Sequence, residues 1–148
     1  MSIRIESVME ANLREVLELF AQYQEFYHVP ADRTKNEQFL RRLLKSPDVG
    51  LQFLAYDGDD PIGFATLVFT ESSLSASRVG TLNDLFVVPK ARGRRAGRAL
   101  MDHCIVHLRA KGLRTMAWLT HPDNHTTQRL YDSYPARREV WVEYTLPL

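Results

Sequence analysis

The sequence contains very little cysteine, which excludes one means of stabilising a fold. Its 148 residues include a single cysteine, Cys104, so no disulfide can form within the chain and a reducing compartment is expected. Long apolar runs are also missing, and the opening residues MSIRIESVMEANLREV lack the apolar core of a signal peptide. We therefore expect a cytoplasmic protein with no membrane partner.

A surplus of positive charge is missing as well. The 19 basic and 18 acidic residues leave a net charge of +1, whereas a general nucleic-acid binder usually carries a basic excess over the whole domain. No nucleic-acid partner is therefore expected. The length is that of one domain, residues 1–148, and 45% of the residues are hydrophobic, which is ordinary for a globular protein with an apolar core.

Positive charge is nevertheless concentrated in one segment, VVPKARGRRAGRAL, at residues 87–100. Its five cations are Lys90, Arg92, Arg94, Arg95 and Arg98. The segment joins an expected strand to an expected helix, and the N–H groups and dipole of a first helical turn attract phosphate. Glycine and alanine at residues 93, 96 and 97 allow close approach. A ligand with several phosphates would use most of the five cations, although a solvated helix face is an alternative.

Known nucleotide motifs are absent from this segment. It has no Gly-Lys-Ser/Thr ending and no GxGxxG, so it does not indicate an ATP or NAD site. Histidines four residues apart, at 103 and 107 and at 121 and 125, have a spacing that is common by chance, and no HExxH is present. No metal site is expected. Cys104 lies in the apolar stripe of a helix and is expected to be a buried thiol.

The periodicity of apolar residues predicts a mixture of strands and helices. Strands are expected at residues 3–8, 51–57, 61–72, 78–88, 115–120 and 139–146. Helices are expected at residues 13–27, 34–46, 96–111 and 124–134. The second helix is expected to open with a capping box, TKNE, at residues 34–37. Helices segregated around a mostly antiparallel sheet place the chain in the α+β class.

Two stretches together resemble a known family. LFVVP is followed by RGRRAG at residues 92–97, and NHTTQRLYD places Asn124 and Tyr131 seven residues apart. On these motifs the chain resembles the GNAT superfamily of acyl-CoA N-acetyltransferases over essentially its whole length. Within it, the chain most resembles the small histone, polyamine and diamine acetyltransferases. One residue departs from the pattern: Arg95 stands where the family usually has a glycine.

The resemblance implies a twisted, mostly antiparallel mixed sheet flanked by helices. Acetyl-CoA, as cosubstrate, would lie between two splayed parallel strands at residues 82–88 and 115–120. The residues that would contact it through backbone or side chain are Leu85, Phe86, Val87, Gly93, Arg94, Arg95, Ala96, Gly97, Arg98 and Asn124. A homodimer is also possible in this superfamily.

The resemblance also implies the chemistry. Tyr131 would donate a proton to the leaving thiolate, although a half-buried aromatic residue is the alternative. The position of the general base in polyamine-type members falls at Asn83, which is not a base. Asp84 is next to it, but a single step along a strand points to the opposite face unless a bulge intervenes. A water relay through backbone carbonyls could serve instead.

The acceptor implied by the subgroup is an amine-bearing small molecule, such as a polyamine or diamine, or a protein lysine. Tyr23, Phe26, Tyr27 and His28 either line the acceptor site or pack between the first two helices. Three alternatives remain open. One is a non-catalytic acyl-CoA-binding sensor, and another is a transferase that acts on an amino acid or an antibiotic amine. The third is a nucleic-acid binder that uses residues 90–98, against which the overall charge balance argues.

Overall fold

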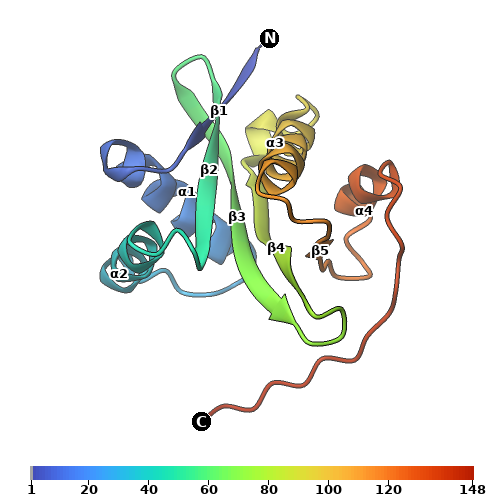
Figure 1. The fold of residues 1–148 in the computed structure, drawn as a ribbon. Helices are drawn as coiled ribbons and strands as arrows, with labels where there is room; N and C mark the ends of the chain where they lie inside the picture. Colours follow the sequence, from blue (N-terminus) through green and yellow to red (C-terminus); the bar gives the residue numbers. More distant parts are fainter. Residues whose placement is uncertain (1) are drawn as a thin grey trace.

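A five-stranded sheet in the order β1-β2-β3-β4-β5 separates two layers of helices in the computed structural model, which describes residues 2–148 (Figure 1). The strands are β1 (Ile3–Ser7), β2 (Gly50–Asp57), β3 (Asp60–Ser72), β4 (Ser77–Val87) and β5 (Met116–Trp118). The strands β1 to β4 pair antiparallel, each with the next, and β5 is parallel to β4. The predicted α+β class and mixed, mostly antiparallel sheet are thus confirmed.

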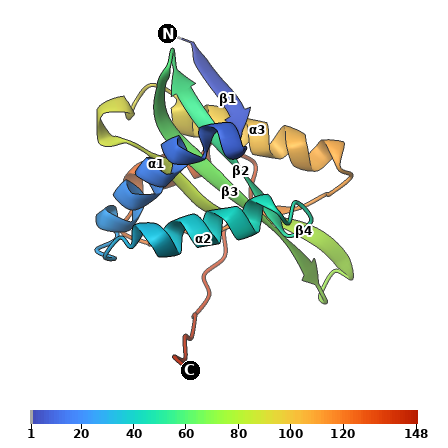
Figure 2. The same cartoon turned by 90° about the vertical axis from the view of Figure 1, so that its left-hand side faces the viewer.

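Helices cover both faces of the sheet. The helices α1 (Leu13–Phe26) and α2 (Arg33–Leu44) lie on one face, and α3 (Ala96–Ala110) and α4 (His125–Asp132) lie on the other (Figures 1 and 2). Two short 3-10 turns, Glu10–Asn12 and Pro89–Ala91, precede α1 and follow β4. None of the helices within residues 2–148 is long and apolar enough to cross a membrane.

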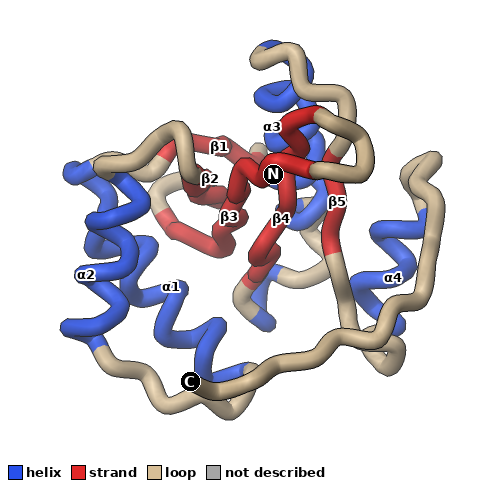
Figure 3. Tube along the Cα trace, turned by 60° about the horizontal axis from the view of Figure 1, so that its bottom comes forward, coloured by secondary structure: helices blue, strands red, loops and turns tan. Residues whose placement is uncertain are grey.

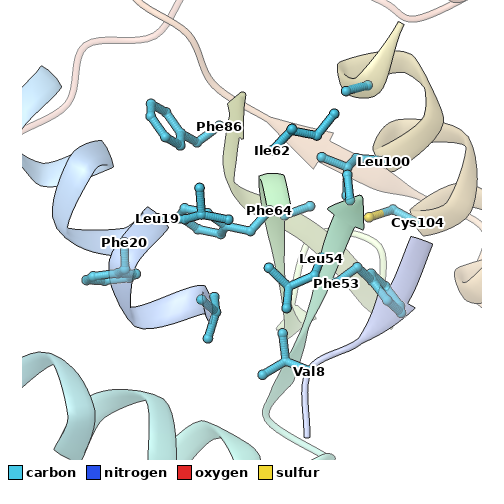
Figure 4. Packing of buried hydrophobic residues seen from close by; sticks show 14 of the residues in the cluster. Val8, Leu19, Phe20, Phe53, Leu54, Ile62, Phe64, Phe86, Leu100 and Cys104 are labelled. Atoms are coloured by element: carbon cyan, nitrogen blue, oxygen red, sulfur yellow. The ribbon is translucent and has the colours of Figure 1, made fainter. Parts of the chain in front are cut away.

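The central strands are buried on both faces because each face has its own apolar layer. On one face, Phe20 of α1 stacks on Phe64 of β3 with ring centroids 6.0 Å apart. On the other face, Leu100 and Cys104 of α3 are fully buried, and Phe53 of β2 lies near them (Figure 4). Each such side chain contributes about 1.5–3 kcal/mol through its removal from water.

Helix α2 begins differently from the prediction. Its N-cap is Asp32, whose Oδ1 accepts a hydrogen bond from the backbone N–H of Lys35 at 3.1 Å. The predicted capping box at residues 34–37 is therefore wrong. Aspartate is among the best N-cap residues, and an extended backbone at Asp32 lets its carboxylate accept from a first-turn N–H. The helix therefore begins at Arg33, and Thr34 lies within its first turn.

The predicted closing strand at residues 139–146 is also wrong. After α4 the chain runs extended and forms no strand in the described structure (Figures 1 and 2). Val140 is 93% exposed and Tyr144 92%. The alternation of apolar residues is present, but a strand also needs a neighbour that accepts and donates its backbone hydrogen bonds. Along residues 2–148 the structure provides no such neighbour for this segment.

Candidate active site

The two parallel strands β4 and β5 remain paired for only three residues. Gly80, Thr81 and Leu82 lie opposite Met116, Ala117 and Trp118. β4 continues to Val87 and stays paired with β3 on its other side, while β5 leads toward α4 (Figure 3). Residues 83–87 therefore present a strand edge without a strand partner in the described chain. Backbone groups on such an edge can pair with a ligand that resembles a strand.

A β-bulge in β4 sets the direction of the side chains in this stretch. Thr66 of β3 lies opposite Asp84, but the next residue, Leu67, lies opposite Leu82. Asn83 is thus the extra residue, and it is exposed. A bulge shifts the alternation of side chains by one. Because of this shift, Asp84 points to the same face as Thr66 and Phe86, toward α1. Without the bulge, its side chain would point to the opposite face of the sheet.

Asp84 ends a row of polar side chains that crosses three strands. Gln52 of β2 lies opposite Thr66, which lies opposite Asp84, and Gln52 Nε2 donates a hydrogen bond to Thr66 Oγ1 at 2.9 Å. Burial raises the pKa of the Asp84 carboxyl, and hydrogen bonds from Tyr23 and Thr66 partly oppose this rise. Asp84 is therefore a more basic carboxylate than an exposed one.

Sequence reasoning missed Gln52 and Thr66. Both are buried and both interrupt strands that are otherwise apolar. A polar residue in a buried strand needs a hydrogen-bond partner, so this interruption was the available signal. The partner itself depends on strand register, which the sequence does not reveal.

Tyr23 of α1 contacts Asp84 and is itself surrounded by other aromatic residues. The ring of Tyr23 lies 5.1 Å from that of Tyr27 and 5.9 Å from that of Phe86. Burial, followed by the charge of Asp84, raises the pKa of Tyr23, and Tyr27 and Tyr131 add to this effect. Asp84, Tyr27 and Tyr131 are therefore all close enough to Tyr23 to act on it. Of the aromatic residues predicted either to line the acceptor site or to pack between helices, Tyr23 packs against Phe20 and Phe64, and its part in an acceptor site stays a prediction.

Tyr131 is held at the other side of this cluster by β5. Its ring packs against Trp118 with centroids 5.5 Å apart. Burial, followed by the proximity of Tyr27, raises the pKa of Tyr131 to about 12. The hydroxyl therefore stays protonated at neutral pH and can donate a proton or a hydrogen bond.

The loop before α3 has the geometry of an anion site. Arg95, the N-cap of α3, has φ 65°, and Gly93 has φ 82°. No side chain caps the first turn of α3 among the described residues, so its N–H groups face outward. A Cβ on Gly97 would come within 3.3 Å of Leu130 Cδ2 of α4. Together with the buried Ala96, Gly97 keeps this turn close to α4.

Two of the five cations are already paired by the β2–β3 hairpin. Lys90 Nζ lies 3.1 Å from Asp60 Oδ2, and Arg94 Nη1 lies 3.2 Å from Asp57 Oδ2. These are exposed pairs, whose individual stabilisation is about 0–1 kcal/mol. They leave fewer free cations for a ligand than the sequence predicted.

The other three cations have different surroundings. Arg92 lies over the ring of Phe26 at 5.2 Å, and Arg98 lies over Tyr134 at 5.0 Å and donates to Ser133 Oγ. Arg95 forms no ion pair with another described residue. The guanidinium of Arg95 is thus the one most available to an anion at the start of α3.

The structure shows which groups of Asn124 and of the β4 residues are available to a ligand. Asn124 is the N-cap of α4, and its Oδ1 accepts from Thr127 N at 3.4 Å, which leaves its NH₂ group as the donor for a ligand. Leu85 and Val87 lie on the open edge and are half-buried, whereas the side chain of Phe86 is buried toward α1. Only the backbone of Phe86 can face a ligand in the split.

The remaining candidate residues have structural surroundings. His103 and His107 pack on Phe53 with ring centroids 4.5 and 5.4 Å away, and burial lowers the pKa of both imidazoles. Burial raises the pKa of the Cys104 thiol to about 12, which keeps it unreactive. Within residues 2–148 no three histidine, cysteine or acidic side chains are grouped as a metal site.

Two open hollows lie away from the split. One, of about 720 Å³, is lined by residues that include Arg4, Glu15 and Tyr56, and the other, of about 660 Å³, includes Gln22 and Lys90. Neither contains Asp84 or Tyr131. The half-buried carboxylate of Asp84, the protonated hydroxyl of Tyr131 and the free edge of β4 lie at the split and not in these hollows, so the chemistry favours the split.

Comparison with known proteins gives a consistent result. The sequence model described as the acetyltransferase (GNAT) family matches residues 13–134. An uncharacterised N-acetyltransferase of Bacillus subtilis, YhfO, is 32% identical over 145 residues, which are 97% of each chain. A crystal structure of a "probable acetyltransferase" is 31% identical, with a TM-score of 0.86 over 98% of this chain and 97% of that one. The structure of AAC(6')-Iy with a CoA bisubstrate analogue has a TM-score of 0.88 at 21% identity over both whole chains and shares the fold.

Proposed function

The chain belongs to the acetyltransferase (GNAT) family, and we propose that it transfers an acetyl group from acetyl-CoA to a primary amine in a ternary complex. The acceptor is a polyamine, a diamine or a protein lysine. The proposal rests above all on the bulge in β4, which brings Asp84 to the side of the split where Tyr23 and Tyr131 lie.

The residues at the split fit acetyl-CoA. The free edge of β4 at residues 83–87 offers backbone groups to the pantetheine arm, as a strand would. The uncapped first turn of α3 offers N–H groups to the pyrophosphate, and Arg95 adds a cation. When bound, acetyl-CoA supplies a thioester whose carbonyl carbon an amine can attack and whose sulfur leaves as a thiolate.

Asp84 and Tyr131 divide the proton transfers between them. An acceptor amine is protonated at neutral pH, and the Asp84 carboxylate accepts that proton, because burial makes it more basic than an ordinary aspartate. Tyr131 holds a proton that it can give to the leaving thiolate. Environments that favour a base at one residue and a protonated donor at the other are typical of acid–base pairs in enzymes.

The surroundings of Asp84 also favour a cationic acceptor. The ring of Tyr23 lies beside its carboxylate and packs against the ring of Tyr27, and aromatic faces attract ammonium groups. Phe26 and Tyr27 are about half exposed at the end of α1, so an acceptor can reach them from solvent. Together these residues support an acceptor with at least one free primary amine.

A second candidate acceptor is an aminoglycoside. The shared fold with AAC(6')-Iy over the full length of both chains supports this candidate, and an aminoglycoside also carries primary amines. A non-catalytic acyl-CoA sensor remains the alternative to any transferase. It predicts CoA binding with no transfer to any amine.

Thiol release from acetyl-CoA by the purified protein distinguishes these functions. The amines to be compared are spermidine, spermine, short diamines, amino acids, aminoglycosides and histone-tail peptides. We expect release that depends on a polyamine, a diamine or a lysine peptide, and a fall of about 10²-fold or more in Tyr131→Phe with CoA affinity retained. Tyr56→Phe is the matched control, because it removes the hydroxyl of another partly buried tyrosine, which donates to Glu15 and lies on β2 away from the split. Release that no amine increases, with CoA bound, would support the sensor.

A further inference from the structure

A row of polar side chains lies inside an otherwise apolar part of the sheet. Gln52, Thr66 and Asp84 lie opposite one another on β2, β3 and β4, and Gln52 is 4% and Thr66 0% exposed. In the next row on the same face, Phe64 lies opposite Phe86 (Figure 4). A buried polar side chain costs free energy unless it is hydrogen-bonded, and two apolar residues would complete this layer without that cost. Packing alone therefore does not explain the row.

The hydrogen bond between Gln52 and Thr66 determines where the hydroxyl proton can go. Gln52 Nε2 donates to Thr66 Oγ1 at 2.9 Å, and an amide NH₂ group has protons to give but accepts none. Thr66 Oγ1 is thus the acceptor in this bond, and its own single proton is free for another partner. Asp84 lies directly opposite Thr66, and side chains in that relation have Cβ atoms about 4.5–5.5 Å apart. The hydroxyl proton is therefore directed at the Asp84 carboxylate.

We propose that Thr66, held by Gln52, is a positioning residue that orients the Asp84 carboxylate and keeps it ionised for the acceptor amine. The inference rests on the proposed function, because that function makes Asp84 the base. The row offers Asp84 a donor, which stabilises the ionised carboxylate more than the protonated carboxyl. A carboxylate has about four acceptor positions, so the bond from Thr66 leaves room for the amine.

The surroundings of Asp84 agree with this role. Burial raises the pKa of its carboxyl, and hydrogen bonds from Tyr23 and Thr66 oppose that rise. Among residues 2–148, Tyr23 is the titratable side chain that acts on Asp84, and its own pKa is raised, so it remains a protonated donor at neutral pH. The two donors come from different elements, α1 and β3, and together they restrain the carboxylate more than either does alone.

Three variants separate the effect of the hydroxyl from that of packing. Thr66→Val keeps a similar shape and removes the donor, but it leaves the NH₂ group of Gln52 without its partner. The double variant Gln52→Leu/Thr66→Val removes both polar groups, which is nearly neutral for stability when shape is kept, and it provides the test if the single variant does not fold. Thr66→Ser keeps the hydroxyl and is the matched control.

A carbon-detected NMR titration of the full-length protein follows the Asp84 carboxyl without any transfer reaction. Asp84→Asn lacks this signal and therefore assigns it. We expect the titration midpoint to move to higher pH in Thr66→Val and in the double variant, because a hydrogen bond to the ionised form is lost. In Thr66→Ser the midpoint should match that of the unaltered protein.

The pH profile of turnover should change in the same way. In Thr66→Val the rising limb of kcat should move to higher pH, and kcat at neutral pH should fall by about 10-fold, the effect of one hydrogen bond to a charged group. KM for acetyl-CoA should stay the same, because the free edge of β4 and the first turn of α3 are unaltered. Thr66→Ser should restore the profile.

An unchanged midpoint of Asp84 in the double variant would overturn the proposal. So would a midpoint that moves as far in Thr66→Ser as in Thr66→Val, because packing and not the hydroxyl would then be responsible. Failure of the proposed function would look different: no amine would increase thiol release by the unaltered protein, while the midpoint would still move in the double variant.

Discussion

One inserted residue, Asn83, determines the direction of the neighbouring carboxylate. The bulge directs Asp84 to the α1 side of the sheet, where Tyr23 and Thr66 donate hydrogen bonds to it. The same side contains Phe64 and Phe86, which keep water away from the carboxyl and raise its pKa. An ordinary strand position would have left a carboxylate with neither these partners nor this basicity.

Replacement of Asp84 by asparagine tests the residue at the centre of this arrangement. Because the folded pKa is raised, the protonated form contributes stability that is fully present below the unfolded pKa. This stability is lost as the pH rises through the folded pKa. At pH 7 the folded protein bears the cost of holding a partly buried, ionised Asp84. Asp84→Asn removes this cost and should raise the melting temperature, while turnover should fall by about 10²–10⁴-fold.

Thermal unfolding and thiol release measured on the same preparation check both effects. Asp59→Asn is the control, because Asp59 is exposed at the tip of the β2–β3 hairpin, and neither quantity should change there. If Asp84→Asn kept the turnover of the unaltered protein, a base role for Asp84 would be excluded and a water relay would be favoured.

At the scale of elements, the N-terminus of α3 combines a charge with a strained backbone. Arg95 adopts φ 65°, a left-handed conformation that costs a residue with a Cβ roughly 1–2 kcal/mol. Arg95→Ala removes the cation but keeps the strain, whereas Arg95→Gly removes both. We expect Arg95→Gly to be the more stable of the two by up to about 1 kcal/mol, after the larger entropy of glycine in the unfolded chain is subtracted.

Both variants should bind CoA more weakly than the unaltered protein, and by a similar factor, because they lose the same charge. Denaturant unfolding and calorimetric titration with CoA measure the two quantities. Unchanged CoA affinity in both variants would show that Arg95 does not contact the ligand.

Periodicity in the sequence was sufficient for most elements, whereas the candidate site was predicted from the basic loop and the family resemblance. The helices α1 and α3 and the strands β2, β3 and β4 lie within a few residues of their predicted bounds, because apolar spacing reports which face is buried. The bulge at Asn83 was not predictable, since an almost continuous apolar run such as LFVV gives no register. Residues 139–146 show the opposite problem: apolar residues alternate there as in a strand, but a strand also needs a neighbour for its backbone groups, which local sequence does not reveal.

At the scale of the whole molecule, the candidate site lies at the boundary between the buried core and the more exposed C-terminal part of the chain. β4 and α1 belong to a core whose last buried residue is Leu108, whereas Trp118 and Tyr131 lie beyond it. Asp84 is therefore held rigidly by packing, and the position of Tyr131 depends on how β5 and α4 are covered. Elements with few buried contacts open more easily than a core does.

Amide hydrogen exchange with and without CoA tests the central claim, that the split between β4 and β5 holds the cosubstrate. We expect CoA to slow exchange in two segments, residues 83–87 and residues 95–98, and to leave β1 and the centre of β2 unchanged. The first segment would pair with the pantetheine arm and the second would donate to the pyrophosphate. Binding of CoA without slower exchange in either segment would contradict the account and would place the cosubstrate elsewhere.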